Sequence, residues 1–220
     1  QPPVLPASGI VSPPPLPEID EALRRPITLA TVRGMERPSE ISGEADRSDE
    51  VTVPARDLVL ARRRGVAIHR MLELLTVAGT DAEIRARVAH EFPELHGQDI
   101  LPACWREARA NIEEPAFRFL FDAAYYEDAR NEVPILYRDG ERDVDGIIDR
   151  LVIAHDELVL VDYKTHPQAT RGNVPELAQA YTRQMRLYGE GVRRLWPGKR
   201  LKLLLLFTAC RATVEVPPAA

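Results

Sequence analysis

Cysteine and long apolar runs are both scarce in this chain of 220 residues. Its two cysteines, Cys104 and Cys210, are too few and too far apart for a zinc site, and they cannot supply the four ligands of an iron–sulfur cluster. Two unpaired thiols are typical of a reducing compartment, so we expect a cytoplasmic location. No apolar run approaches membrane-spanning length, and residues 1–8 lack the basic start and apolar core of a signal peptide. We therefore expect no membrane contact.

Positive charge is in short supply as well. The 29 lysines and arginines are outnumbered by 34 aspartates and glutamates, which gives a formal net charge of −5. A nucleic-acid-binding protein with this balance must rely on local basic clusters or on a partner. Two such clusters contain Arg62, Arg63 and Arg64 and, later, Arg193 and Arg194, although solvated helix surfaces explain them almost as well. The chain also lacks the phosphate-binding motif G-x-x-x-x-G-K-[ST], so we expect no ATP site in it.

Composition divides the chain into two parts. Residues 1–53 are rich in proline, serine and acidic residues, which predicts a linker or extended segment. Residues 54–220 show helical patterns first, then strand patterns, one more helix from Pro175 to about Leu195, and two closing strands. This order predicts one α/β domain whose central mixed sheet is flanked by helices.

The most informative stretch runs from 144 to 165 and reads V-D-G-I-I-D-R-L-V-I-A-H-D-E-L-V-L-V-D-Y-K-T. Two apolar runs flank a polar turn, which predicts two buried antiparallel strands. With the turn centred on His155 and Asp156, Asp149 lies directly opposite Asp162, their Cβ atoms about 5 Å apart. Alternation places Lys164 on the same face as Asp162. A bulge would shift this register by one residue and separate the two carboxylates.

Two carboxylates and an ammonium group on one apolar sheet favour a metal site. Burying like charges so close together is costly unless a cation lies between them, and hard oxygen ligands suit Mg²⁺ or Mn²⁺. Lys164 would hold or activate the attacking water. The competing interpretation is a strand-end salt bridge between Asp162 and Lys164, with Asp149 exposed at the rim. We favour the metal site because both strands are apolar on both faces.

Two helical patterns add further candidates. In G-V-A-I-H-R-M-L-E, His69 lies one turn after Gly65, and a glycine inside a helix, which costs roughly 1 kcal/mol relative to alanine, usually marks a close approach. In the later helix, Tyr181, Gln184 and Tyr188 share overlapping faces. Taken alone, His69 is more simply a histidine at the edge of the core. The later three residues fit tyrosine packing with an edge glutamine equally well.

Together these motifs resemble those of a known family. G-I-I-D-R-L and V-D-Y-K-T look like the signature of the PD-(D/E)XK nuclease superfamily, and more narrowly of RecB-type and AddA-type nuclease domains. The patterns G-x-x-x-H-x-x-L-E and Y-x-x-Q-x-x-x-Y match two further motifs of that group, in the same order. The tail with R-Q-M-x-L-Y and W-P-G-K-R is most similar to the C-terminal nuclease domain of an AddA helicase–nuclease subunit. The resemblance implies a restriction-endonuclease-like core with extra N-terminal helices.

The resemblance also implies roles for individual residues. The implied ligands of Mg²⁺ or Mn²⁺ are His69, Asp149, Asp162 and the backbone carbonyl of Tyr163. The implied catalytic residues are Asp149, Asp162, Lys164 and Gln184. Candidate DNA contacts are Arg62, Arg63, Arg64, Tyr188, Arg193 and Arg194. An acidic residue often stands at the position of Glu132 in the family, although a solvated strand glutamate is the simpler interpretation here.

The function implied by the resemblance is that of a magnesium-dependent deoxyribonuclease. It would hydrolyse phosphodiesters, mainly in single-stranded DNA, during double-strand break repair and recombination. Its implied partners are DNA, helicase domains upstream in a parent chain and an AddB-type subunit. Two alternatives stay open: a catalytically inactive nuclease fold that binds DNA or docks a partner, and a purely structural partner-binding domain. Metal binding separates the first interpretation from both.

Overall fold

The computed structural model describes residues 35–39, 55–77, 79–96 and 99–218, in which one short strand precedes a group of helices. The long early helices are α3 (Ala55–Leu75), α4 (Asp81–Glu91) and α5 (Ile100–Ile112). A capping box starts α4, because the Thr80 hydroxyl accepts from the N–H of Glu83 and the Glu83 carboxylate accepts from the N–H of Thr80. The short turn η2 (Pro93–Leu95) lies between α4 and α5, and η3 (Pro115–Phe117), α6 (Arg118–Phe121) and η4 (Ala123–Tyr125) lead from α5 to the sheet. None of the helices in these ranges combines the length and apolar character needed to cross a bilayer.

Six strands in the described ranges form one mixed sheet. They are β1 (Met35–Glu36), β2 (Asp128–Asp139), β3 (Arg142–Ile153), β4 (Glu157–Lys164), β5 (Arg200–Phe207) and β6 (Ala212–Val216). The pairs β2–β3, β3–β4 and β5–β6 are antiparallel, whereas β1–β3 and β4–β5 are parallel. The predicted α/β class with a central mixed sheet is therefore confirmed.

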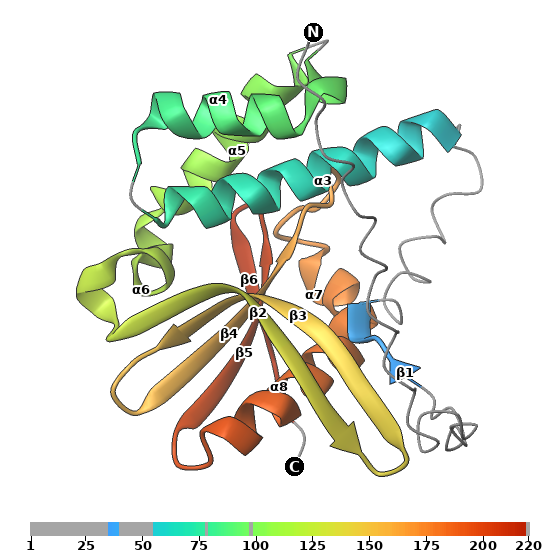
Figure 1. Ribbon diagram of the computed structural model, residues 1–220, viewed down its shortest axis with the longest axis vertical. Coiled ribbons are helices and arrows are strands. Elements are labelled where there is room, and N and C mark those ends of the chain that lie inside the picture. Colours follow the sequence, from blue (N-terminus) through green and yellow to red (C-terminus); the bar gives the residue numbers. More distant parts are fainter. Residues whose placement is uncertain (1–34, 40–54, 78, 97–98, 219–220) are drawn as a thin grey trace, which may run out of the picture. The chain divides into compact units, whose positions relative to one another are not determined.

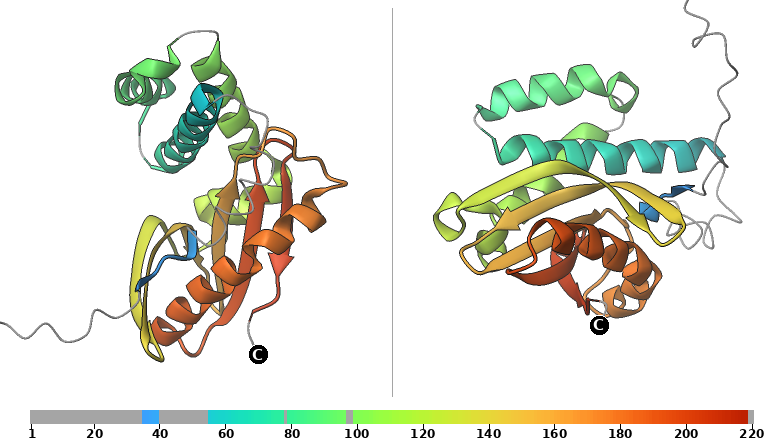
Figure 2. Two further views of the ribbon diagram at one scale, coloured as in Figure 1. Left: turned by 90° about the vertical axis from the view of Figure 1, so that its right-hand side faces the viewer. Right: turned by 60° about the horizontal axis from the view of Figure 1, so that its bottom comes forward.

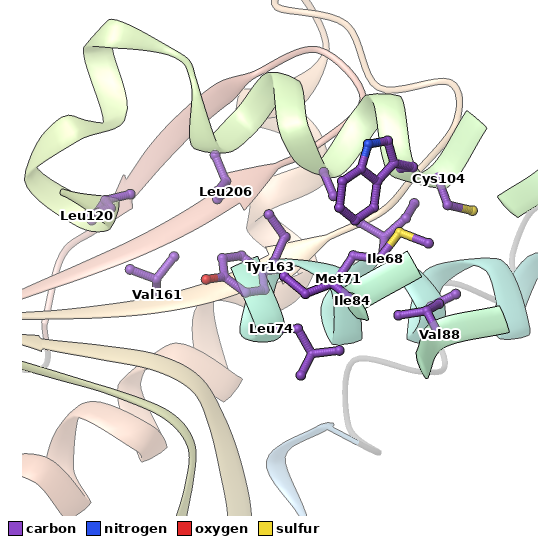
Figure 3. Packing of buried hydrophobic residues seen from close by; sticks show 14 of the residues in the cluster. Ile68, Met71, Leu74, Ile84, Val88, Cys104, Leu120, Val161, Tyr163 and Leu206 are labelled. Carbon is purple, nitrogen blue, oxygen red and sulfur yellow. The ribbon is translucent and has the colours of Figure 1, made fainter. Parts of the chain in front are cut away.

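Helices cover both faces of the sheet (Figures 1 and 2). On one face, Val161, Tyr163 and Leu206 share a core cluster with side chains of α3, α4 and α5 (Figure 3), and α3 lies between α4 and the sheet (Figure 2). On the other face, α8 (Thr182–Leu195) packs on Leu160 and Leu205. The two sets come from alternate positions of the same strands, as the pleat requires. Because both faces are buried, the central strands are mostly apolar. A charged side chain among them costs folding free energy unless it is paired.

The last helical segment differs from the continuous helix predicted for residues 175–195. It consists of α7 (Val174–Leu177), the tighter turn η5 (Ala178–Tyr181) and then α8. The Tyr181 hydroxyl lies 2.5 Å from Nε2 of His166, and its ring centroid lies 3.8 Å from Nζ of Lys164. We attribute the change of helix type to these tertiary contacts, which side-chain periodicity does not contain.

A buried arginine ties β3 to its surroundings beside Asp149. The guanidinium of Arg150 donates to the carbonyl of Leu120 at 2.8 Å, to Oδ1 of Asn131 at 2.7 Å and to the hydroxyl of Tyr126 at 3.1 Å. These acceptors come from α6, β2 and the turn before β2. Because a buried guanidinium is costly unless its donors are paired, these bonds fix the position of β3 at this point.

A short segment from the predicted linker belongs to the sheet. Most of residues 1–53 lies outside the described residues, but β1 pairs in parallel with β3, Met35 opposite Asp143 and Glu36 opposite Val144. The Glu36 carboxylate forms ion pairs with Arg142, at 3.3 Å, and with Arg183. The domain division after residue 53 stays a prediction, but Met35–Ser39 takes part in the fold that follows it.

Candidate active site

The β3–β4 hairpin brings the two predicted carboxylates to neighbouring positions. All four of its residue pairs have the register predicted from a turn centred on residues 155 and 156. Asp149 and Asp162 occupy the next positions, where the regular pairing ends. There the N–H of Tyr163 donates to Oδ2 of Asp149 at 2.6 Å. The predicted register is thus confirmed, and the Asp149 side chain accepts a hydrogen bond that a backbone carbonyl would otherwise receive.

The sheet divides at this point. Since β2 occupies one edge of β3 from end to end, β1 and β4 must share the other edge. β4 pairs with β3 from Arg150 onward, and β1 pairs with it at Asp143 and Val144 (Figure 1). The unshared stretch borders a pocket of about 600 Å³. Its lining residues are Ser39, Val66, His69, Arg70, Glu73, Glu132, Ile147, Asp149, Asp162, Tyr163, Lys164, Gln184 and Tyr188.

His69 and Asp149 form an ion pair inside this pocket. Nδ1 of His69 lies 3.3 Å from Oδ1 of Asp149. Burial lowers the pKa of His69, but the charge of Asp149 and the hydrogen bond to it outweigh burial, so the pKa of His69 is raised. Burial raises the pKa of Asp149, but His69 and the N–H of Tyr163 outweigh it, so the pKa of Asp149 is lowered. Without metal, the two groups therefore stabilise each other as ions.

Asp162 is a buried carboxylate whose pKa is shifted in the opposite direction from that of Asp149. It is 3% exposed, its Oδ1 accepts from Nε2 of Gln184 at 2.9 Å, and its Oδ2 lies 2.7 Å from Nζ of Lys164. Burial, together with the negative charge of Asp149, raises the pKa of Asp162 and outweighs the attraction of Lys164. The ionised form of Asp162 is therefore less favourable here than in water, and additional positive charge would stabilise it.

Lys164 is held by one group from its own strand and by two from the last helical segment. Its ammonium contacts Asp162, donates to Oε1 of Gln184 at 3.2 Å and lies over the ring of Tyr181. The Gln184 amide therefore satisfies two partners at once, because its nitrogen donates to Asp162 while its oxygen accepts from Lys164. Its nitrogen also lies 3.4 Å from the hydroxyl of Tyr188. The predicted trio Asp149, Asp162 and Lys164 thus lines one pocket together with Gln184.

The donor set suits a hard divalent cation. Carboxylate oxygens are the ligands that Mg²⁺ and Mn²⁺ prefer, and the buried Oδ2 of Asp162 has no hydrogen-bond donor of good geometry. Within the described ranges, no group of three His, Cys, Asp or Glu side chains is already placed to hold a metal ion. His69 is paired with Asp149, and Lys164 with Asp162. We therefore expect metal binding to replace these two ion pairs, with release of the His69 proton.

Gly65 brings α3 close enough for His69 to reach the sheet. A Cβ atom added to Gly65 would lie 2.7 Å from Oγ1 of Thr165, which follows Lys164 directly. The close approach predicted from a glycine inside a helix is therefore confirmed. One helical turn later, His69 reaches Asp149. A larger residue at Gly65 would have to displace the Thr165 hydroxyl or move α3, and His69 with it, away from the carboxylates.

The substitution His69→Ala tests whether this histidine supports metal binding. We expect it to weaken Mn²⁺ binding by roughly 10- to 100-fold and to lower cleavage similarly, with partial recovery in excess Mn²⁺. Calorimetric titration of both proteins with Mn²⁺ measures the effect. His155→Ala is the matched control, because His155 lies exposed in the turn of the same hairpin. Equal Mn²⁺ affinities for the wild type and His69→Ala would leave His69 with a packing role only.

The predicted DNA-contacting residues are mostly engaged with other groups of the protein. Ion pairs join Arg63 to Glu94, Arg64 to Glu107 and Arg194 to Glu190. Arg62 and Arg193 also have interaction partners. Tyr188 is buried, and of these six residues it alone lines the pocket. A role of these residues in DNA binding stays a prediction.

Glu132 has a backbone conformation that its sequence context did not predict. Its φ angle is 50°, in the left-handed region that a β-strand residue rarely adopts. The flanking pairs, Asn131 with Arg150 and Val133 with Ile148, place Glu132 opposite Asp149, and the two do not pair themselves. Burial and the charge of Asp149 raise the pKa of Glu132. The strained position thus adds Glu132 to the carboxylates that line the pocket, which are those of Glu73, Asp149 and Asp162.

Ser39 is a pocket residue that the sequence did not indicate. It lines the pocket, and its hydroxyl hydrogen-bonds to that of Tyr188, which lies next to Gln184. Proline, serine and acidic residues surround it, and no periodicity marks this part of the chain. A predicted strand just before Ser39 could have drawn attention to it, but β1 consists of Met35 and Glu36 alone, which is too short to predict from sequence.

Comparison with known proteins gives a family match for most of the chain. The protein-family model of the PD-(D/E)XK nuclease superfamily matches residues 44–218. No curated protein matches the sequence. A crystal structure of a "Putative exonuclease" from Eubacterium rectale is 15% identical, with a TM-score of 0.40, and the match covers 66% of this chain and 59% of that one. The crystal structure of SSO0001 is also 15% identical, with a TM-score of 0.31 and coverage of 71% and 77%.

Proposed function

This chain belongs to the PD-(D/E)XK nuclease superfamily, and on that basis we propose that it is a divalent-metal-dependent deoxyribonuclease. One observation carries the proposal: Asp149, Asp162 and Lys164 line a single pocket at the point where β3 and β4 separate. A purely structural domain has no need for two neighbouring carboxylates in an apolar sheet, since burying them is costly. A catalytically inactive nuclease fold has no need for Lys164 in addition.

Each residue of the pocket has a part in the proposed reaction. Asp149, Asp162, the carbonyl of Tyr163 and His69 would hold Mg²⁺ or Mn²⁺. Bound there, the cation supplies positive charge that stabilises the negative charge developing on the phosphate oxygens. Lys164 donates a hydrogen bond to the attacking water and orients it toward phosphorus. Gln184 keeps Lys164 and Asp162 in position through its two hydrogen bonds.

The finer assignment is an AddA-type or RecB-type nuclease domain that acts in double-strand break repair and recombination. The order of the motifs around His69, Asp149, Lys164 and Gln184 supports it. In this proposal helicase domains of a parent chain and an AddB-type subunit deliver unwound DNA. The net charge of −5 fits such delivery, because the counterion-release contribution to unaided DNA binding is weak for an acidic chain.

Cleavage assays with defined substrates test the proposed function. We expect the isolated chain to cut an end-labelled single strand in Mg²⁺ without regard to sequence, and a blunt duplex much more slowly. Rising salt should suppress both reactions, because phosphate contacts dominate the affinity. Efficient, sequence-selective cleavage of intact duplex at physiological salt would contradict the proposal. Absence of Mg²⁺ or Mn²⁺ binding would favour an inactive fold.

The response to calcium is a further expectation. Ca²⁺ should bind the carboxylates yet support little cleavage, because its variable coordination orients the attacking water poorly. The same labelled single strand, incubated with Ca²⁺ in place of Mg²⁺, measures this directly. We expect added Ca²⁺ also to inhibit the Mg²⁺ reaction by competition. Rapid digestion with Ca²⁺ as the sole divalent ion would argue against metal-assisted orientation of water.

A further inference from the structure

The part of the β2–β3 ribbon beyond the active site has two unlike faces. Between residues 133 and 148, one face packs on α8 through Ile135 and Ile148. The opposite face carries Pro134, Leu136 and Ile147, which we call the apolar stripe. Pro134 pairs directly with Ile147, and Leu136 lies two residues farther along the same face. The burial of the first face therefore does not explain the apolar residues of the second.

The apolar stripe is exposed. Leu136 is 73% exposed and Ile147 53% exposed. Single exposed apolar residues are common on protein surfaces and need no explanation, but contiguous apolar patches mark interaction surfaces, and here one of the two residues, Ile147, lines the pocket. The two residues lie diagonally across the ribbon, next to each other on one face. We therefore treat them as one surface.

This surface continues into the active site. Asp149 is two residues after Ile147 on β3, so the two side chains lie about 6.7 Å apart along one face of the ribbon. Ile147 and Asp149 line the same pocket. On the facing helix α3, Val66 lines the pocket too and is 51% exposed. When the reacting group of a substrate lies at Asp149 and Asp162, the parts of the substrate next to that group lie beside the aliphatic side chains of Ile147 and Val66.

Two carboxylates beside the apolar stripe are neutralised by arginines. Beyond Ile147, Asp145 forms an ion pair with Arg37 at 3.7 Å, and Asp143 forms one with Arg138 at 3.1 Å. The two carboxylates of β3 nearest to Ile147 on this part of the ribbon are thus each paired with an arginine. A phosphodiester chain that passes beside Ile147 toward the pocket meets Asp143 and Asp145 as members of ion pairs.

We propose that the apolar stripe contacts the faces of unpaired bases next to the scissile phosphate and so selects single-stranded nucleic acid. The inference rests on the proposed nuclease function and adds the part of the substrate that the protein recognises. In a duplex, the bases are stacked and paired, and only sugars, phosphates and groove edges face outward. In a single strand, every base can offer a flat apolar face, and contacts to such faces are tolerant of sequence. Aliphatic side chains take this role here, in a chain with 6% aromatic residues.

Paired substitutions in protein and substrate test this contact. The variants are Leu136→Thr and Ile147→Thr, alone and together, because threonine keeps the β-propensity of the strand while removing apolar surface. The substrates are a single strand and the same strand with abasic nucleotides flanking the cleaved bond. We expect the double variant to raise KM for the normal strand about 10-fold, since one base contact is worth roughly that factor, with kcat nearly unchanged. With the abasic strand, the variants and the wild type should have equal KM.

Leu195→Thr is the matched control. Leu195 is 63% exposed at the end of α8 and does not line the pocket. The KM of the Leu195→Thr variant should therefore equal that of the wild type on both strands. Thermal unfolding of each variant checks that the fold is intact. Equal KM for the double variant and the wild type on the normal strand would overturn the inference. So would an equal loss on normal and abasic strands, because the stripe would then act without touching bases.

A binding measurement keeps the inference separate from the proposed function. Fluorescence anisotropy of a labelled single strand, without divalent ions, should show the same loss of affinity for the normal strand and none for the abasic strand. If the wild type cuts no DNA but this pattern appears, the nuclease proposal fails and the base contact stands. If the wild type cuts DNA but the pattern is absent, the base contact is wrong. Variants that bind DNA normally yet lose a complex with a protein partner would also show it to be wrong.

Discussion

Asp162→Asn should abolish Mn²⁺ binding in the pocket and lower cleavage by at least about 10³-fold, or roughly 4 kcal/mol of transition-state stabilisation. Asparagine keeps the shape of the side chain and still accepts from Gln184, so the change removes charge and little else. Cleavage of a labelled single strand and calorimetric titration with Mn²⁺ measure the two effects. The matched control is Asp156→Asn, in the turn of the same hairpin, where the carboxylate is exposed and paired with Arg200. Cleavage near the wild-type rate in Asp162→Asn would remove Asp162 from the mechanism.

The same variant has a second expected property, which separates loss of chemistry from loss of fold. Because the pKa of Asp162 is raised in the folded protein, ionisation of this carboxyl lowers stability at pH values above its unfolded pKa. Without metal, Asp162→Asn should therefore unfold at an equal or higher temperature than the wild type at pH 7. The difference should disappear below about pH 4, where the wild-type carboxyl is protonated in both states. A large decrease in unfolding temperature at pH 7 would mean that the ion pair with Lys164 outweighs the repulsion from Asp149.

Lys164→Met should separate metal binding from catalysis. We expect cleavage to fall about 10²- to 10³-fold, because the group that orients the attacking water is lost. Mn²⁺ affinity should stay equal or increase, because Nζ of Lys164 lies 2.7 Å from Oδ2 of Asp162 and its charge opposes a cation there. Single-turnover cleavage and Mn²⁺ titration of the same preparation test both expectations.

The control for this variant is Lys202→Met on the neighbouring strand β5. Lys202 is paired with Glu215 at 3.6 Å and does not line the pocket, so neither measurement should change. Loss of Mn²⁺ binding in Lys164→Met would assign Lys164 to the integrity of the metal site instead of the chemical step. Cleavage at the wild-type rate would leave only the salt bridge with Asp162 as its role.

The sequence predicted those parts of the pocket that depend on local rules. A turn centred on residues 155 and 156 determines every pair of the β3–β4 hairpin, so Asp149 and Asp162 could be placed opposite each other by counting. Gly65 signalled its close approach because glycine inside a helix is costly without a reason. His69 and Gln184 were identified by resemblance, since the spacing of their own helices fits ordinary packing equally well.

Other parts depend on tertiary contacts that no local rule contains. Glu132 has its left-handed conformation opposite Asp149, and nothing in its neighbouring residues predicts it. The change of helix type before α8 accompanies the contacts of Tyr181 with His166 and Lys164. The arginine cluster of α3 looked available for phosphate because the acidic partners of Arg63 and Arg64 lie far away in the sequence. Arg63, for instance, is 31 residues from Glu94.

The division of the sheet has a consequence for how the protein folds. The hydrogen bond between Asp149 and Tyr163 joins residues 14 positions apart, within a single hairpin. The contacts of Glu36 that hold β1 at the other side of the division join residues 106 and 147 positions apart. Closing long loops costs more entropy and is slower, so we expect the hairpin to form early and β1 to join late. The hairpin would then bring Asp149 and Asp162 together early in folding, and β1 would complete the surroundings of the pocket late.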